Sequence, residues 1–488
     1  MIRFAFRRFR WILILAICFT SSVWAIPAVA QEPSLPDGTV PSAEEFSSYL
    51  PYISRQEIVC PAAHPLRSST PFGVQMYTDT RSSVPAFEPL MELNASWVRS
   101  QVYWSHVEPN NTTPDRFNWE KPDIGLAVAR EGGMNVIATI AGNPGWATPN
   151  HDGYIPAENL DEFAEFMGAL VERYDGDGYQ DDPCGRVVKY WEMYNEPDGM
   201  SKPGDVRWGE YGAGYAEMLK AVYPAIKAAN PDAQVVFGGL AYDWFTDQEP
   251  AGPFVRNFLP DVLAHGGGDY FDVMNFHVYP AFAPNWVQQP SDGPGLYEKA
   301  AAIRQVMAAY GVSKPMVITE AGTHSNADGT SASTPAIQSS YVVALYTQTM
   351  AANIQTMIWF MLYDPPEWYP NKNGLMDTSN PPVLKLAYYT YQRTAGKLAG
   401  ATFDRILSDA ETGNSDMLAY RFVDAAGRAL YVAWMAPIKT GGSATLTLRG
   451  STAQVLDIFG ASTDVQAGGN SRLEIPVTNR PIIIEVSE

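Results

Sequence analysis

The chain is poor in cysteine and histidine, with three and six residues respectively among 488. The histidines form no HExxH pair and no clustered spacing, so we expect no catalytic metal and no cofactor. The Gly-x-Ser-x-Gly elbow of serine hydrolases is also lacking. Basic residues are scarce, with 33 Lys and Arg against 53 Asp and Glu. The resulting formal charge of −20 argues against nucleic acid or anionic lipid as a partner.

Long hydrophobic runs are lacking after the first 30 residues. Within these residues, four arginines precede a mostly apolar stretch (11–25), and Ala28-Val29-Ala30 forms a small-residue cleavage pattern. This order predicts a cleaved secretory signal peptide over residues 1–30. A retained membrane anchor is the alternative, although the apolar run is short for a membrane span. Cleavage removes four arginines and no acid, which moves the charge from −20 to −24. We expect a secreted or cell-envelope protein with no membrane partner after cleavage.

Only Cys60 and Cys184 remain after this cleavage. In an exported chain two cysteines form one disulfide bond or stay as two free thiols, and the sequence leaves both alternatives open. Residues 31–70 are rich in Pro and Ser and predict a leader or wrapping segment.

From about residue 71, short apolar runs alternate with amphipathic helical stretches. The predicted strands begin at Phe72, Ser96, Asn135, Val187, Gln234, Phe271, Pro315 and Thr356. Eight such units indicate an α/β fold, a closed (β/α)₈ TIM barrel over residues 71–400. A doubly wound open sheet is the alternative, but no Gly-rich phosphate motif follows the first strand. Residues 401–488 show short alternating strands without helices, which predict a small antiparallel β-sandwich. A packing or accessory role and a sugar-binding role are both open for it.

Two glutamates end predicted strands of the barrel. Asn195-Glu196-Pro197 ends the fourth strand, and Glu320 ends the seventh. Because catalytic groups lie at the C-terminal ends of barrel strands, both side chains are expected at the same mouth. Cleavage of a glycosidic bond requires such a pair, one carboxyl protonated and the other ionised. Burial and mutual repulsion help to separate the two pKa values.

These motifs resemble the clan of retaining glycoside hydrolases built on (β/α)₈ barrels, and within it glycoside hydrolase family 39 and its uncharacterised relatives. The similarity covers about residues 71–400. It is carried by the segments YWEMYNEPD, PMVITEAG, NPGWATP, FHVYP and the strand-two segment WVRSQVYWSHVEPNNTTPDRFNWEKPD. The resemblance implies an O-glycosyl hydrolase that acts on an oligosaccharide or polysaccharide.

The resemblance also implies roles for individual residues. Glu196 would be the acid/base and Glu320 the nucleophile of a double displacement at a β-glycosidic bond. Asn195 would bind the sugar 2-hydroxyl, and Arg99 would support the nucleophile. The other implied substrate contacts are His277 and Tyr279, with Trp359 as the floor of the pocket.

Each supporting residue has a structural alternative. Arg99 could neutralise a buried acid, His277 could be a core histidine, and Trp359 could be ordinary core. Trp146 and Trp368 lie in loops at the predicted mouth, where they stack on sugar or pack the loops. Strand alternation places Glu192 on the same side as Glu196, so we expect it below the site, paired with Arg99.

The acidic segment 175–182 partly resembles a calcium loop, but it lacks the ligand spacing and closing Glu of an EF-hand, which favours a solvated turn. Two alternatives to hydrolysis also remain open. They are a non-catalytic carbohydrate-binding protein on a barrel scaffold and a transglycosylase that uses the same residues.

Overall fold

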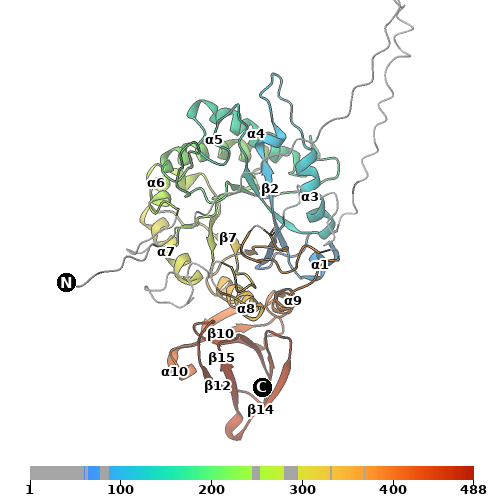
Figure 1. Ribbon diagram of the computed structural model, residues 1–488, viewed down its shortest axis with the longest axis vertical. Coiled ribbons are helices and arrows are strands. Elements are labelled where there is room, and N and C mark those ends of the chain that lie inside the picture. The colour runs from blue at the N-terminus through green and yellow to red at the C-terminus, as the bar shows by residue number, and fades with distance from the viewer. Residues whose placement is uncertain are drawn as a thin grey trace, which may run out of the picture. The chain divides into compact units, whose positions relative to one another are not determined.

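Eight parallel strands form the inner sheet of the chain in the computed structural model (Figure 1). Neighbouring strands follow the order β5-β4-β3-β2-β1-β8-β7-β6. Parallel bridges from Val236 to Val273 and from Leu240 to Phe276 join the β5 edge to the β6 edge. The sheet therefore nearly closes into a barrel, as predicted. Its strands are β1 (Phe72–Gln75), β2 (Trp97–Tyr103), β3 (Asn135–Ala141), β4 (Tyr190–Met193), β5 (Gln234–Val236), β6 (Met274–Val278), β7 (Met316–Ala321) and β8 (Met357–Trp359).

The structure describes residues 60, 64–76, 87–243, 253–279, 295–329, 332–365, 367, 369–379 and 381–487. The predicted signal peptide (1–30) and most of the predicted leader (31–70) lie outside these residues. Trp368 does too. Among the described residues, no helix is both long and apolar enough to cross a bilayer.

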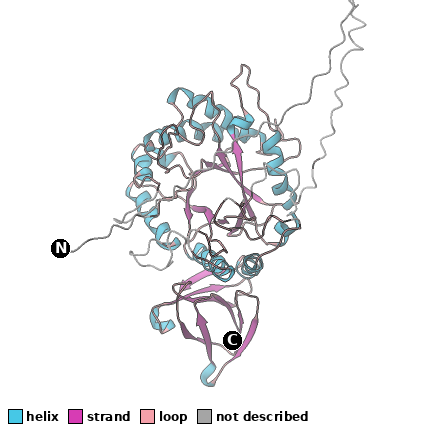
Figure 2. Cartoon of the chain, viewed as in Figure 1, coloured by secondary structure: helices cyan, strands magenta, loops and turns pink. Residues whose placement is uncertain are grey.

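Helices surround the strands of the barrel, as Figure 2 shows in cyan around magenta. In α4 the buried side chains of Phe163, Phe166, Met167, Leu170 and Val171 recur every three or four residues, which gives one apolar face for the core. The helices are α1 (Phe87–Glu92), α2 (Trp104–Val107), α3 (Glu120–Gly132), α4 (Leu160–Arg173), α5 (Gly212–Ala229), α6 (Phe258–Ala264), α7 (Leu296–Ala309), α8 (Pro335–Ala351) and α9 (Leu386–Leu398).

Antiparallel strands follow the barrel, in a six-stranded sheet ordered β14-β13-β16-β11-β10-β9 and a two-stranded sheet of β12 and β15. The two sheets share a hydrophobic core that includes Leu446, Leu473 and Ile484. A short helix, α10 (Asp409–Thr412), interrupts the strands. The strands are β9 (Thr402–Ile406), β10 (Met417–Val423), β11 (Ala429–Met435), β12 (Ser443–Arg449), β13 (Thr452–Leu456), β14 (Ser462–Gln466), β15 (Arg472–Thr478) and β16 (Ile482–Ser487). The sequence pattern missed β9 and β14, the two edges of the larger sheet.

The larger sheet packs against barrel helices through its other face. Tyr420 and Trp434 stack at 5.2 Å between ring centroids, and both belong to the same apolar cluster as the barrel core. Thr390 of α9 donates a hydrogen bond to the carbonyl oxygen of Ile458 at 2.7 Å. This shared core means that the β-sandwich stabilises α8 and α9, whatever else it does.

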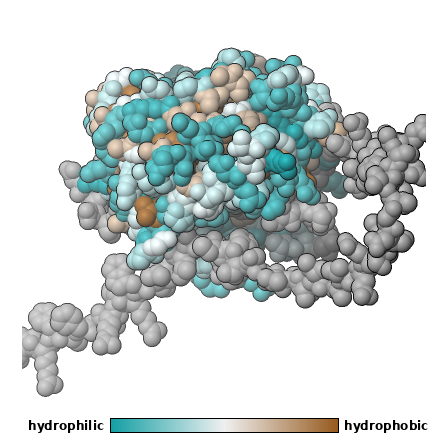
Figure 3. Space-filling view, turned by 90° about the horizontal axis from the view of Figure 1, so that it is seen from above, coloured by the Kyte–Doolittle hydropathy of each residue, from teal (hydrophilic) through white to brown (hydrophobic). Residues whose placement is uncertain are grey.

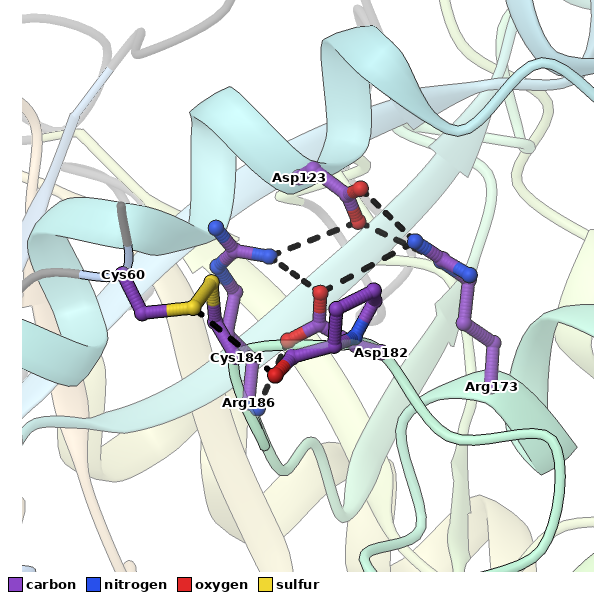
Figure 4. The surroundings of a disulfide bond; sticks show 7 residues. Cys60, Asp123, Arg173, Asp182, Cys184 and Arg186 are labelled. Atoms are coloured by element: carbon purple, nitrogen blue, oxygen red, sulfur yellow. Dashed lines mark hydrogen bonds and ion pairs between the residues drawn. A yellow bond between two sulfur atoms is a disulfide. The ribbon is translucent and has the colours of Figure 1, made fainter. Parts of the chain in front are cut away.

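Cys60 and Cys184 form a disulfide bond, so the first of the two alternatives for these cysteines is correct. Figure 4 shows the bond beside an ion pair between the buried Asp182 and Arg186. The bridge attaches the start of the described chain to the loop that enters β4. It therefore lies at the N-terminal end of that strand, opposite the end that carries the predicted site.

The surface drawn in Figure 3 is mostly hydrophilic over the described residues, with hydrophobic residues scattered among them. Isolated apolar residues of this kind are usual on protein surfaces.

Candidate active site

The chain leaves the extended conformation at the end of β4. Tyr194 and Glu196 both have positive φ angles, 65° and 47°. A residue other than glycine in this region carries roughly 1–3 kcal/mol of strain. Asn195, between them, bridges to Gly239 beyond β5. This turn directs Glu196 out of the strand at its C-terminal end, the end that carries catalytic groups in barrels of this kind.

Two glycines beyond β5 leave room for this turn. A Cβ atom on Gly238 would lie 2.5 Å from the carbonyl oxygen of Met193, and one on Gly239 would lie 2.0 Å from His277 Nε2. Contacts this short are sterically forbidden, so both positions require glycine. The Gly-Gly pair in the fifth strand motif was a signal of this close approach, and the sequence prediction did not use it.

Arg99, from β2, lies at the centre of the site and is fully buried. It donates to Glu192 Oε2 at 2.7 Å, to Glu320 Oε1 at 2.6 Å and to Asn195 Oδ1 at 2.7 Å. Burial alone would lower the pKa of Arg99, but the charges of Glu192 and Glu320 outweigh it and raise the pKa. Because Asn195 uses its oxygen for Arg99, its amide nitrogen faces elsewhere as a donor.

Glu192 is fully buried inside the barrel and accepts hydrogen bonds from four residues. Arg99 and Thr139 donate to it, and so do Asn275 at 2.8 Å and Thr319 at 2.8 Å. Burial alone would raise the pKa of Glu192, yet Arg99 outweighs it and holds the pKa below its usual value. Glu192 is therefore ionised, and the predicted pairing with Arg99 is present.

Glu320 ends β7, and its side chain is 10% exposed. Arg99 donates to one of its carboxyl oxygens, and Tyr279 donates its hydroxyl to the other at 2.5 Å. Burial and the charge of Glu320 raise the pKa of Tyr279 well above its usual value. The phenol thus keeps its proton for this hydrogen bond at neutral pH.

Glu196 lies opposite, with its side chain 30% exposed and its Oε1 atom 3.1 Å from His277 Nδ1. Burial raises the pKa of Glu196 to about 7, and Asp243 adds to the effect while Arg99 and Lys299 oppose it. Burial also lowers the pKa of His277 to about 4, so this imidazole is neutral near pH 7. A carboxyl group with such a pKa is suited to donate and recover a proton.

The two strand-end carboxyl groups face each other across a short gap. His277 Nδ1 lies 3.1 Å from Glu196 Oε1 and 3.9 Å from Glu320 Oε2. One oxygen of each carboxyl group and one ring nitrogen of His277 all lie within 4.8 Å of one another. A reacting centre between the two groups is thus within reach of both.

Two clusters of acids and histidines in the described residues are compact enough to be considered for a metal. One is Glu196, His277 and Glu320, and the other is Asp175, Asp177 and Asp181. In the first cluster the guanidinium of Arg99 already binds Glu320 at 2.6 Å, and its charge would repel a cation. The second is a surface turn whose carboxylates accept backbone hydrogen bonds. We therefore assign neither cluster to a metal, and the expectation of a metal-free enzyme stays a prediction.

The two predicted aromatic substrate contacts that the structure describes, Trp359 and Trp146, both pack against protein groups. Trp359 is fully buried and donates to the carbonyl oxygen of Asn373 at 3.2 Å. A sugar could stack on it only after a covering residue moved, so its role as the floor of the pocket stays a prediction. Trp146 is partly buried, donates to the carbonyl oxygen of Glu108 and lies edge-on to Trp104. Its contacts are those of a residue that packs a loop.

Six of the predicted residues thus join one hydrogen-bonded cluster: Glu196, Glu320, Asn195, Arg99, His277 and Tyr279. The sequence prediction missed the polar residues that connect them, Gln75, Thr139, Asn275 and Thr319. Thr319 was hard to find because it directly precedes Glu320, and neighbours on a regular strand face opposite sides. A register shift in the pairing of β7 with β6 lets both side chains reach the interior.

A sequence model of the cellulase family, glycosyl hydrolase family 5, matches residues 68–364. The chain belongs to this family. It is therefore a glycosidase of the retaining barrel clan that the motifs indicated. The matching model is that of family 5, whereas the motifs resembled family 39 of the same clan. No curated protein matches the sequence.

Solved structures of other glycosidases share the fold of this chain. One is a family 39 glycoside hydrolase from Bacteroides cellulosilyticus WH2, with 20% identity and a TM-score of 0.65 over 88% of this chain and 83% of that one. A glucosidase from Croceicoccus marinus has 14% identity and a TM-score of 0.59 over 88% and 98%. A family 30 endoxylanase from Clostridium papyrosolvens C71 has 13% identity and a TM-score of 0.57 over 87% and 98%.

Proposed function

We propose that this glycosidase cleaves β-glycosidic bonds with retention, through a double displacement in which Glu196 is the acid/base and Glu320 the nucleophile. The observation that carries the proposal is that one oxygen of the Glu196 carboxyl group lies within 4.8 Å of one oxygen of the Glu320 carboxyl group. Retaining enzymes keep the two carboxyl groups about 5–5.5 Å apart, whereas inverting enzymes need roughly 6.5–9.5 Å to admit a water molecule.

In the first step Glu320 attacks the anomeric carbon while the bond to the leaving oxygen breaks. Glu196 transfers its proton to that oxygen, and the sugar becomes an ester of Glu320. The pKa of about 7 gives Glu196 the proton that this step consumes. Tyr279 and Arg99, which hold the two oxygens of Glu320, orient the nucleophile for attack.

In the second step Glu196 takes a proton from water as the water oxygen attacks the same carbon. The ester bond to Glu320 breaks, and Glu196 is protonated again. Asn195 is the candidate for the sugar 2-hydroxyl, because Arg99 fixes its oxygen and leaves its amide nitrogen to donate. Hydrogen bonds at this hydroxyl strengthen in the transition state of such reactions.

Azide rescue tests the assignment of the two glutamates. With an aryl β-glycoside, Glu320→Gly should lose turnover, regain rate with azide and release the α-glycosyl azide. Glu196→Ala should release the β-glycosyl azide instead, and Glu217→Ala on the exposed face of α5 should match the wild type. A retained azide product from Glu320→Gly would reverse the assignment. Binding without turnover across a broad panel of glycosides would favour a carbohydrate-binding protein.

We also propose that the enzyme is exported through the signal peptide predicted at residues 1–30. The disulfide between Cys60 and Cys184 supports this, because such bonds persist in oxidising compartments. Cell fractionation followed by N-terminal sequencing tests it. A cytoplasmic protein that keeps its first 30 residues would contradict the proposal.

A further inference from the structure

A chain of hydrogen bonds leads from the buried Glu192 to Glu196. Thr319 Oγ1 lies 2.8 Å from Glu192 Oε1 and 3.0 Å from His277 Nε2. The other ring nitrogen, His277 Nδ1, lies 3.1 Å from Glu196 Oε1. Glu192 has no direct contact with the reacting atoms in the proposed mechanism. These hydrogen bonds connect it to the residue proposed as the acid.

Thr319 determines which groups donate and which accept along this chain of hydrogen bonds. The backbone N–H of Thr319 donates to Asn275 Oδ1 at 3.1 Å, which fixes the orientation of that amide. Asn275 Nδ2 then donates to Thr319 Oγ1 at 2.7 Å and to Glu192. The hydroxyl has one proton to give, and its possible acceptors are Glu192 Oε1, Asn275 Oδ1 and His277 Nε2. The carboxylate is the charged acceptor and the nearest, so it takes the proton.

This direction determines the tautomer of His277. Because the Thr319 hydroxyl points to Glu192, its oxygen faces the ring as an acceptor, and His277 Nε2 must carry the hydrogen. A neutral imidazole then has a bare lone pair on Nδ1. That lone pair faces Glu196 Oε1, and two acceptors at 3.1 Å need a hydrogen between them. Glu196 supplies it only in its protonated form.

We propose that Glu192 and Thr319 are positioning residues that hold His277 as the Nε2–H tautomer and thereby keep Glu196 protonated, ready to act as the acid. The inference rests on the proposed function, since it assigns the residues that prepare Glu196 for that reaction. It also gives Glu192, which was expected to be structural, a part in catalysis that acts through Thr319 and His277.

The same arrangement serves the second step of the reaction. Once Glu196 has given up its proton, its carboxylate faces the Nδ1 lone pair of His277. This repulsion raises the affinity of Glu196 for a new proton, which favours its removal from water.

Other charged residues act on the pKa of Glu196 independently of this chain of hydrogen bonds. They are Arg99 from β2, Lys299 from α7, Arg207 and Asp198 from the loop after β4, Asp243 after β5 and, through His277, Glu320 from β7. Variants that remove only the Thr319 hydroxyl leave all of these charges in place. A change in the pKa of Glu196 in such a variant can therefore be assigned to the chain of hydrogen bonds.

The experiment measures both the tautomer and the pH profile. In the ¹⁵N NMR spectrum of the wild-type enzyme, His277 should be the Nε2–H tautomer. In Thr319→Val the ring is free to place its hydrogen on Nδ1 and donate to ionised Glu196. The basic limb of kcat/KM should then move to lower pH by about one unit, while Thr319→Ser keeps the wild-type profile.

Two results would overturn the inference: an Nδ1–H tautomer in the wild type, or an unshifted profile in Thr319→Val with an intact circular dichroism spectrum. The tautomer measurement needs no folded variant and no substrate. A wild-type enzyme that turns over no glycoside would instead refute the proposed function and leave the tautomer result standing.

Discussion

Arg99 and Glu192 form an ion pair at 2.7 Å in which neither side chain is exposed to solvent. The pair lies under the mouth of the barrel, and the same guanidinium also binds Glu320 at 2.6 Å. One cation thus compensates two acids. Removing it would leave both without their cationic partner, with Glu192 fully buried and the side chain of Glu320 only 10% exposed.

Arg99→Met is therefore expected to lower the free energy of unfolding by about 3–5 kcal/mol, the usual effect of breaking a buried pair. Urea denaturation followed by circular dichroism measures it. Arg449→Met on the exposed surface of β12 is the matched control and should change stability by less than about 0.5 kcal/mol. Equal stability of the two variants would show that the pair is not the support inferred for the site.

Gly239→Ala tests the close approach of the chain beyond β5 to His277. The new Cβ would lie 2.0 Å from His277 Nε2, so the ring must move away from Glu196. Displacement of a positioned group by about 1 Å can cost about 100-fold in rate, and we expect a loss of kcat/KM of at least that order. Steady-state kinetics measure it. Gly442→Ala, where a Cβ meets nothing within 4 Å, should be as active as the wild type. A fully active Gly239→Ala enzyme would mean that the position of His277 is not critical.

The barrel could be predicted because each of its strands is an apolar run between helical patterns, and all eight predictions match a strand. In the β-sandwich the same reasoning failed at the two edges. The side chains of β9 and β14 are largely exposed, so neither strand shows the alternation that marks a half-buried strand.

The site residues that end strands could be predicted, and those whose orientation depends on how neighbouring strands pair were missed. Glu196 and Glu320 follow from the rule that places catalytic groups at the C-terminal ends of strands. Thr319 could not be found this way, because regular alternation lets only one of Thr319 and Glu320 face inward, and the bulge that brings both to the interior arises from pairing with β6. The role of Trp359 came from the resemblance and that of Trp146 from its place in a loop at the mouth, and both stay predictions because the contacts of these residues here are those of packed residues.

The pH profile of the enzyme follows from the raised pKa of Glu196. The acid must be protonated, and its pKa is about 7, so kcat/KM should level off below pH 7 and fall about tenfold per unit above it. An aryl β-glycoside with a poor leaving group reports this limb. A dinitrophenyl glycoside is the control, because its dinitrophenolate leaving group departs without protonation. The kcat/KM for this substrate should therefore not fall above pH 7. A basic limb shared by both substrates would assign the titration to another group.

The disulfide should contribute to stability and leave catalysis unchanged, because it lies at the opposite end of β4 from Glu196. It links residues that are 124 positions apart, and removing a disulfide typically lowers the free energy of unfolding by about 2–4 kcal/mol. Cys184→Ser is thus expected to unfold at lower urea concentration with an unchanged kcat/KM. The wild-type enzyme under reducing conditions should behave like the variant. A large loss of kcat/KM in the folded variant would mean that strain at the entrance of β4 is transmitted along the strand to the turn at Glu196.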